Sequence, residues 1–315
     1  MIPYLLTILL FFPAVSALLT YAGGRNARVA RWLGTGLSLV PLALSSYLVL
    51  AFLLRPSDLA SATVGGHTYY GWEEYAWIPQ VNVDYRLGVD GLSVFLVFLT
   101  TLLTTLALAF SWDEHHRIRE FYAMFLFMET TILGVFLSLD FFLFFIFWEV
   151  GLVPMYFIIA VWGGPRKRYA AIKFFLFTQA ASLLVLLGIF AMYFYGGTFD
   201  MTVLIDRNPL AAAAPLTASL VFVGFLIGFG TKLPTWPLHT WLPDAHVEAP
   251  TGGSVLLAGI LLKLGGYGLF RVNVEMMVET AKAWWWLLAL LGVVSILYGA
   301  FVCLAQDDLK RMVAF

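Results

Sequence analysis

The fold is decided by the stretch Phe141-Phe142-Leu143-Phe144-Phe145-Ile146-Phe147-Trp148, which opens an apolar segment that runs to residue 162. Lipid offers no hydrogen-bond partner to a bare backbone, so only α-helices and closed β-barrels span a bilayer. The strands of such a barrel alternate between apolar and polar residues over about ten positions. This stretch does not alternate, and it therefore predicts a membrane-spanning helix.

The remainder of the chain repeats this pattern. A bilayer core of ~30 Å requires ~20 apolar residues in a helix. Only 12% of the 315 residues are charged, about half the share of a soluble protein. The first segment is too long for a signal peptide and has no charged region before it, so we expect it to be a retained span. The composition predicts an all-α polytopic membrane protein, and nine segments have the required length: 2–21, 32–54, 89–111, 121–139, 141–162, 169–195, 216–236, 251–272 and 283–304.

The distribution of Lys and Arg predicts the orientation, because cytoplasmic loops carry the excess of these residues. With the N-terminus outside, the inner connections hold Arg25, Arg28, Arg31, Arg117, Arg119, Arg166, Lys167, Arg168, Lys310 and Arg311, and the outer ones hold Arg55, Arg86, Arg207, Arg271 and Lys282. This bias places the N-terminus on the non-cytoplasmic side of the cell (inner) membrane. We expect the longest connection, roughly 55–88, to be an interfacial loop with aromatic anchors such as Trp77.

Several classes of function are not indicated. A net charge of -1 gives no reason to expect nucleic acid. A lone cysteine, Cys303, cannot hold an iron–sulfur cluster, and no glycine-rich nucleotide fingerprint follows a strand-like run. We therefore expect no redox centre, no cofactor site and no metal site in this chain.

Some ionisable residues lie inside the predicted spans, where a charge costs ~2.5–3.5 kcal/mol. Lys263 lies close to the middle of the eighth span, too deep for its side chain to reach the interface. Glu129 lies within the fourth span. Lys173 follows Arg168 by only five residues, so snorkelling to the interface explains it as well as a function does. A purely structural ion pair is the alternative explanation for Lys263.

One helix is predicted to be interrupted, in Gly230-Thr231-Lys232-Leu233-Pro234-Thr235-Trp236-Pro237. Each proline removes a helical hydrogen bond, and discontinuous helices mark ion pathways in transporters. Glu149 lies ~12 Å into the fifth span among apolar neighbours, and a nearby lysine would keep it charged. We therefore expect Glu149 and Lys232 to form a pair. An ordinary proline kink is the alternative.

Two histidines follow the interruption. His239 and His246 are seven residues apart, which is not the spacing of a compact zinc site. Histidine titrates near neutrality, so a proton-entry relay is one interpretation. A loop connecting two helices, which would also contain Asp244 and Glu248, is the favoured one.

These motifs resemble the subunit M (chain 4) family of the NADH–quinone oxidoreductases. The resemblance rests on Phe147 to Tyr156, on Tyr169 to Gln179, and above all on Lys232 through Pro250 and on to Lys263. It implies an antiporter-like fold with two inverted repeats, each with a broken helix. It also implies that Glu149 and Lys232 are a coupled pair and that Lys263 passes protons onward.

The resemblance also sets expectations for partners and domains. NADH, flavin, iron–sulfur clusters and quinone would be bound by partner subunits, and other membrane-arm subunits and the lipid bilayer would surround this chain. We expect residues 1–120 to hold three spans and the interfacial loop, 121–272 to form the first repeat, and 273–315 to begin a second. The chain stops where the family continues into a tenth span, so we expect a C-terminally truncated sequence.

Three alternatives stay open at this point. The same buried charges suit a multi-subunit cation/proton antiporter, or a subunit of a membrane-bound hydrogenase or deazaflavin-linked dehydrogenase. A structural scaffold of a membrane arm is the third, and it leaves Lys263 without a role.

Overall fold

The computed structural model describes residues 3–24 and 26–315. Ile2 and Arg25, which the sequence assigned to the first span and to an inner connection, lie outside the described residues. Nine helical segments within the described part are long and apolar enough to cross a membrane. Their positions confirm the nine predicted spans: Leu5–Gly23, Ala27–Leu54, Ser93–Phe110, Ile118–Leu137, Phe141–Trp162, Lys167–Gly196, Pro215–Lys232, Thr251–Val274 and Trp285–Leu304.

Seven of the nine spans in the described part are single helices, and the other two are divided into shorter elements. The helices that match single spans are α1 (Leu5–Gly23), α2 (Ala27–Leu54), α3 (Ser93–Phe110), α4 (Ile118–Leu137), α7 (Lys167–Gly196), α9 (Pro215–Lys232) and α14 (Trp285–Leu304). The fifth span comprises α5 (Phe141–Val150) and α6 (Leu152–Trp162), and the eighth comprises α11 (Thr251–Leu256), η4 (Leu257–Leu261), α12 (Leu262–Gly268) and η5 (Leu269–Val274). Both η4 and η5 are π-helical.

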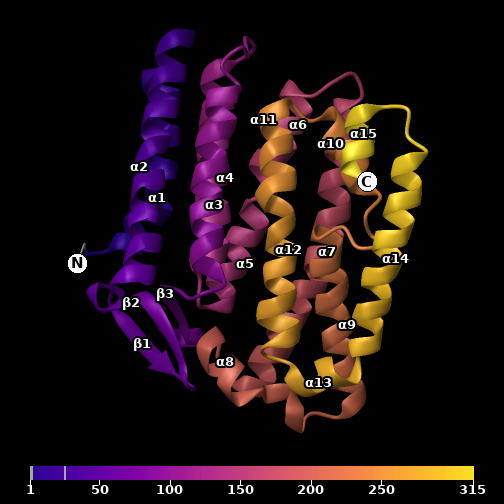
Figure 1. Cartoon of the computed structure of the whole chain (residues 1–315). Helices are drawn as coiled ribbons and strands as arrows, with labels where there is room; N and C mark the ends of the chain where they lie inside the picture. The colour runs from indigo at the N-terminus through magenta and orange to yellow at the C-terminus, as the bar shows by residue number, and fades with distance from the viewer. Residues whose placement is uncertain (1–2, 25) are drawn as a thin grey trace.

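The spans stand side by side as one bundle, and short elements close its two ends (Figure 1). At one end lie the sheet, α8 (Met201–Arg207), η3 (Pro209–Ala212) and α13 (Val278–Ala283), and toward the other lie α10 (Trp241–Glu248) and α15 (Leu309–Ala314). The fourth span is the most covered of the nine, with 83% of its apolar window buried. Helix α4 is therefore the centre about which the N-terminal spans pack.

The connection 55–88, which the sequence predicted to be an interfacial loop, contains regular secondary structure. It contains two short helical turns, η1 (Pro56–Asp58) and η2 (Pro79–Val81), and an antiparallel sheet of β1 (Ser61–Val64), β2 (His67–Ile78) and β3 (Val83–Val89). Gly65 and Gly66, both with positive φ, form the two-residue turn between β1 and β2. Such a turn matches the twist of the flanking strands, so the Gly-Gly pair was the signal for this hairpin.

The sheet is attached to the first helix by a carboxylate. Glu73 on β2 accepts hydrogen bonds from the backbone N–H groups of Leu6 and Thr7, at 2.8 and 3.1 Å. These are groups of the first turn of α1, which have no partner within the helix. The negative charge also suits the positive end of the helix dipole. The sheet therefore caps α1 and lies at the same end of the bundle as α8 (Figure 1).

Candidate functional site

The interruption predicted after the seventh span is present. Helix α9 ends at Lys232, and α10 begins at Trp241. Pro234 has no N–H to donate to the carbonyl of Gly230, and Thr235 donates to that oxygen instead, at 2.8 Å. The indole N–H of Trp241 donates to the carbonyl of Thr231 at 2.8 Å. The freed carbonyls are thus satisfied from beyond the break, which stabilises an open helix end at Lys232.

Lys232 is buried, and its ammonium group lies against Trp148 of α5. The Nζ atom is 3.8 Å from the centre of the indole ring and 3.4 Å from the Trp148 carbonyl oxygen, to which it donates. A desolvated cation over an indole face is stabilised by about 2 kcal/mol. The indole is held in place because its Nε1 donates to the Ser182 hydroxyl of α7 at 3.0 Å. Trp148 is therefore the direct partner of Lys232.

Glu149 is the next residue along the chain from this contact, at the junction of α5 and α6. In the described part of the chain it forms no ion pair with Lys232, and its Oε1 atom is buried without a hydrogen-bond partner. The helix is loosened here, because Pro154 cannot donate to the carbonyl of Val150. An unpartnered buried carboxylate oxygen is costly, and the ion pair with Lys232 that the sequence predicted is not formed among the residues that the structure describes.

Glu129 is a second unpartnered carboxyl. It lies on α4 with no exposed surface, and neither of its oxygens has a hydrogen-bond partner among the described residues. Burying an isolated ionised carboxylate is expensive, and such a group escapes the cost by binding a proton. Nothing in the described part brings Glu129 into an ion pair with Lys232 or Lys263.

Lys263 lies near the middle of the eighth span, Thr251–Val274, as predicted, and its side chain is exposed among the described elements. It follows the π-helical segment η4, and its Nζ donates to the carbonyl of Ala258 at 2.6 Å. A π-helical turn widens the helix and is frequent at functional sites. The described elements leave the Lys263 face of this helix uncovered, which is the physical reason that the lysine reaches the surface.

Lys173 has a carboxylate partner that the sequence did not reveal. Its Nζ lies 2.6 Å from Asp244 Oδ2, and Arg166 lies 3.7 Å from the other oxygen of the same carboxylate. Asp244 is four residues before Glu248, which accepts a hydrogen bond from the backbone N–H of Arg166 at 2.8 Å. The prediction of a connecting loop is wrong for Asp244 and Glu248, because both lie in helix α10. The four-residue spacing of the two acids was the available signal, since it places them on one helix face.

The two histidines are not brought together as a pair. His239 lies in the non-helical segment, with its ring centre 5.2 Å from that of Tyr298, and His246 is buried on α10. The Nδ1 atoms of both are buried, and neither has a hydrogen-bond partner among the described residues. Burial lowers the pKa of both imidazoles, and the charge of Lys310 lowers that of His246 further. A cavity of about 310 Å³, whose polar lining includes His239, Asp244 and Gln306, opens beside His239.

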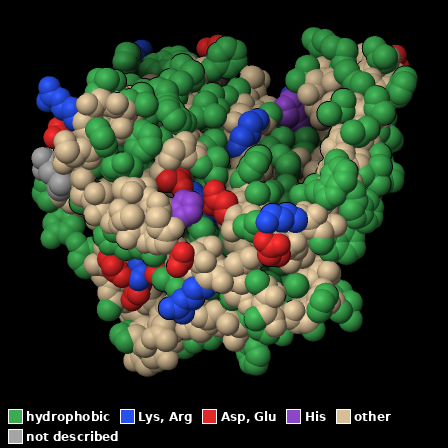
Figure 2. Space-filling view, turned by 60° about the horizontal axis from the view of Figure 1, so that its bottom comes forward, with side chains coloured by type: hydrophobic (Ala, Val, Ile, Leu, Met, Phe, Trp, Pro, Cys, Tyr) green, Lys and Arg blue, Asp and Glu red, His purple; other side chains and the backbone are tan. Residues whose placement is uncertain are grey.

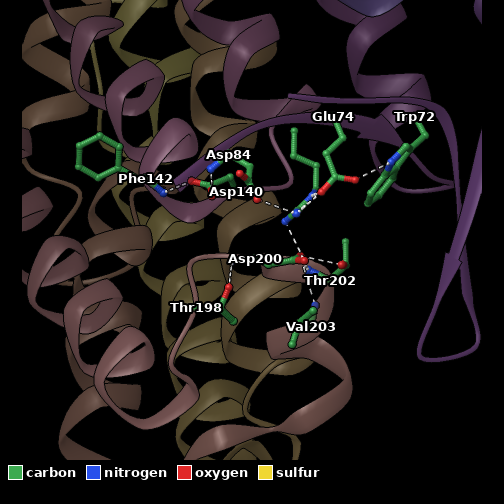
Figure 3. A network of polar contacts seen from close by, with 10 residues as sticks. Trp72, Glu74, Asp84, Asp140, Phe142, Thr198, Asp200, Thr202 and Val203 are labelled. Atoms are coloured by element: carbon green, nitrogen blue, oxygen red, sulfur yellow. Dashed lines mark hydrogen bonds and ion pairs between the residues drawn. The ribbon is translucent and has the colours of Figure 1, made fainter. Parts of the chain in front are cut away.

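A separate polar network lies at the end of the bundle that carries the sheet, and charged side chains gather on this face (Figure 2). Arg86 on β3 is buried and pairs with Asp84 at 2.9 Å, with Asp200 at 2.7 Å, and with Glu74. Figure 3 shows Glu74, Asp84 and Asp200 converging in this network, with Asp140 beside Asp84. The sequence had placed Arg86 in an outer loop and gave no sign of this cluster.

Asp140 and Asp200 also begin helices. Asp140 accepts hydrogen bonds from the N–H groups of Phe142 and Leu143 at the start of α5, at 2.8 and 3.1 Å. Asp200 does the same for Thr202 and Val203 of α8. These are N-caps. The network thus ties the sheet to the start of α5, the helix that carries Trp148 and Glu149.

Arg271 was assigned to a loop and is instead buried in η5, at the end of the eighth span. It pairs with Asp90 at 2.6 Å and with Glu275 at 2.8 Å. Asp90 also accepts from the N–H groups of Leu92 and Ser93. Burial alone would raise the pKa of Asp90, but Arg271 and the hydrogen bonds with Ser93 lower it overall. This pair joins the sheet, α3 and η5.

The fold and this geometry define a class: a polytopic membrane protein in which a broken helix ends on a buried lysine, the arrangement of ion-translocating membrane proteins. The model of the NADH:quinone oxidoreductase/Mrp antiporter transmembrane family matches residues 138–315. The chain belongs to this family.

Named relatives agree with this membership. The chain is 43% identical to NAD(P)H-quinone oxidoreductase chain 4 of Nostoc sp. over 98% of its own length and 56% of the relative's. It is 40% identical to NADH-quinone oxidoreductase subunit M of Rhodobacter capsulatus, over 99% of this chain and 61% of that one. The chain therefore spans somewhat more than half the length of these curated relatives.

Two solved structures have the same fold over 98% of this chain. A chain of respiratory complex I from Thermus thermophilus superposes with a TM-score of 0.81 at 29% identity, with 61% of that chain covered. A chain of the Mrp complex from Dietzia sp. superposes with a TM-score of 0.79 at 25% identity, with 32% of it covered. The antiporter-like fold is thus shared by redox-linked complexes and antiporters.

Proposed function

We propose that this chain is a proton-translocating membrane-arm subunit of an NADH–quinone oxidoreductase, and that Lys232, Glu149 and Lys263 carry the protons. The observation that carries the proposal is the position of Lys232, buried at an open helix end and seated on Trp148, next to Glu149. NADH oxidation and quinone reduction take place on partner subunits, which hold the flavin, the iron–sulfur clusters and the quinone.

The proposed step is a movement of the Lys232 side chain between two partners. On Trp148 the ammonium group is held by the ring face and a carbonyl oxygen, and an approach to Glu149 replaces these neutral partners with a carboxylate. A driving force of ~200 mV corresponds to ~4.6 kcal/mol per proton, a change in proton affinity of more than a thousandfold. Making and breaking a buried ion pair supplies changes of this size.

Other groups complete the path in this proposal. His239 and the cavity beside it admit protons to Lys232 from the end that holds α10. Glu129 and His246 are secondary relay candidates, and Lys173 adjusts this end through Asp244. Lys263, beside the π-helical turn, passes protons onward. In the proposed orientation the N-terminus and the sheet face the non-cytoplasmic side of the inner membrane. Residues 121–272 form the first antiporter-like repeat, after three spans in 1–120, and 273–315 begin a second.

The test uses the complete complex in proteoliposomes with a pH-sensitive dye. Lys232→Ala and Glu149→Ala should each abolish most quinone reduction and pumping, while NADH oxidation with an artificial acceptor continues. Glu149→Asp should retain part of the activity, because the charge survives on a shorter side chain. Normal pumping by both assembled alanine variants would contradict the proposal, and sodium uptake without quinone turnover would favour the antiporter alternative.

A further inference from the structure

The outer face of α7 carries two apolar grooves that share a ridge. The first, about 600 Å³, lies between α7 and α9, and the second, about 420 Å³, lies between α7 and α6. Ile172 and Leu176 line both grooves and form the ridge between them, called the α7 ridge below. The two side chains are 42% and 62% exposed, so the ridge stands free of protein among the described residues.

The first groove is long enough to hold an acyl chain across one leaflet of a bilayer. Its lining on α7 runs from Tyr169 to Leu184, which is ~22 Å of helix at 1.5 Å per residue. Half of a bilayer's hydrocarbon core is ~15 Å, and a lipid headgroup would lie beyond that depth. Except for Lys173 and Thr231, the lining of the groove is apolar or aromatic.

The end of the ridge is basic. Arg166, Lys167 and Arg168 precede or begin α7. Arg166 is engaged by Asp244 and Glu248, and Lys167 donates to the carbonyl of Val161 at 2.7 Å. Arg168 is exposed and has no ion pair in the described part of the chain. Arg168 lies one helical turn before Ile172 on the same face of α7. Its unengaged guanidinium group complements the phosphate of a lipid whose acyl chains fill the two grooves.

We propose that the α7 ridge binds one anionic glycerophospholipid of the phosphatidylglycerol class. The phosphate lies on Arg168, beside Tyr169, and one acyl chain occupies each groove on either side of Ile172 and Leu176. The inference depends on the membrane location of α7 and not on proton translocation, so it stands or falls independently of the proposed function. A basic side chain near the surface strengthens binding of an anionic lipid by ~1 kcal/mol, which is about fivefold.

The experiment uses the complete complex in vesicles doped with phosphatidylglycerol that carries a photoreactive diazirine on one acyl chain. Cross-linked peptides are identified by mass spectrometry and compared with those labelled by a phosphatidylcholine probe with the same chain. We expect the anionic probe to label the peptide that contains residues 172–184 about fivefold more than the zwitterionic probe. Equal labelling by the two probes would reduce the ridge to an ordinary lipid-facing surface and overturn the proposal.

Two variants and a control distinguish binding of the lipid headgroup from binding of its acyl chains in the grooves. Arg168→Gln should lower labelling by the anionic probe about fivefold and leave the zwitterionic probe unchanged. Ala180→Trp, at an exposed position that lines the first groove, should lower labelling by both. Arg28→Gln, another exposed arginine, should change neither. If a photoreactive amino acid at position 176 captures another protein subunit instead of lipid, the ridge is a protein interface and the proposal is wrong.

Discussion

Removal of the Arg86 side chain tests the role of the polar network at the sheet end. Arg86 has 8% of its side chain exposed, whereas its partners Glu74, Asp84 and Asp200 are 42%, 31% and 14% exposed. Pairs with the two more exposed carboxylates are screened and contribute about 0–1 kcal/mol each. Breaking a buried pair costs ~3–5 kcal/mol. Asp200 keeps three hydrogen bonds from Thr202 and Val203, so we expect the lower end, ~3 kcal/mol, for Arg86→Ala.

The assay is hydrogen–deuterium exchange of the assembled complex, read on the peptides that contain β2 and α8. A loss of ~3 kcal/mol in local stability raises the population of the open state roughly 150-fold. We expect that increase in residues 198–207 and in the sheet, with no change in the middle of α7. The exchange of Arg86→Lys should lie between that of the parent and that of Arg86→Ala, because a single ammonium group cannot make the paired hydrogen bonds of a planar guanidinium.

A double-mutant cycle isolates the pair, and a nearby residue provides the control. Arg86→Ala combined with Asp200→Asn should cost less than the sum of the two single variants, because each single variant leaves a partner unpaired. Arg207→Ala, an exposed arginine at the end of α8, should leave exchange within a few fold of the parent. Unchanged exchange in Arg86→Ala, or strict additivity in the cycle, would refute the role assigned to Arg86.

Two further predictions concern α5 and its packing. Burial raises the pKa of Asp140 to about 6, against the opposing effect of hydrogen bonds from Leu143, Asp84 and Phe142 and the charge of Arg86. The folded state therefore holds this proton more tightly than the unfolded state. Local stability at the start of α5 should fall as pH rises from about 4 to 6, measured by hydrogen–deuterium exchange. Asp140→Asn, which keeps the cap acceptor, should remove this pH dependence. A Cβ at Gly134 would meet the Phe147 ring at 2.1 Å, so Gly134→Ala should destabilise the packing of α4 against α5 by ~1–3 kcal/mol. The control is Gly36→Ala, which should be neutral or slightly stabilising because a Cβ there meets nothing within 4 Å. Equal thermal stability of the two variants in the purified complex would contradict the packing argument.

The sheet shows why one part of the fold escaped sequence interpretation. The connection 55–88 is rich in aromatic residues, and these suit a membrane interface as well as a strand. Gly65 and Gly66 predict a hairpin turn, but the extent of the strands is set by pairing with β3 and by irregularities near Tyr70 and Ile78. Such register shifts depend on the partner strand, which hydropathy does not report.

The interruption after Lys232 could be predicted because its causes are local. Proline lacks an N–H wherever it occurs, so Pro234 and Pro237 together remove two helical hydrogen bonds within one turn. The single prolines Pro13 and Pro41, by contrast, stay inside α1 and α2. The same argument from length and composition gave the nine spans. The sequence by itself thus determined that this chain is a bundle of membrane-spanning helices, and that one of them stops at a lysine.

Only the tertiary structure decided what the charged side chains meet. Lys232 lies on Trp148, Lys173 on Asp244, and Arg86 among Glu74, Asp84 and Asp200. These partners depend on how each helix is rotated and how far it is displaced along its axis. Both quantities come from the packing of whole helix faces, since a rotation by one residue turns a side chain by about 100°. Hydropathy predicts that a helix crosses the membrane, but it does not determine how the helix is rotated about its axis. The chemistry of the site therefore depends on the packed bundle.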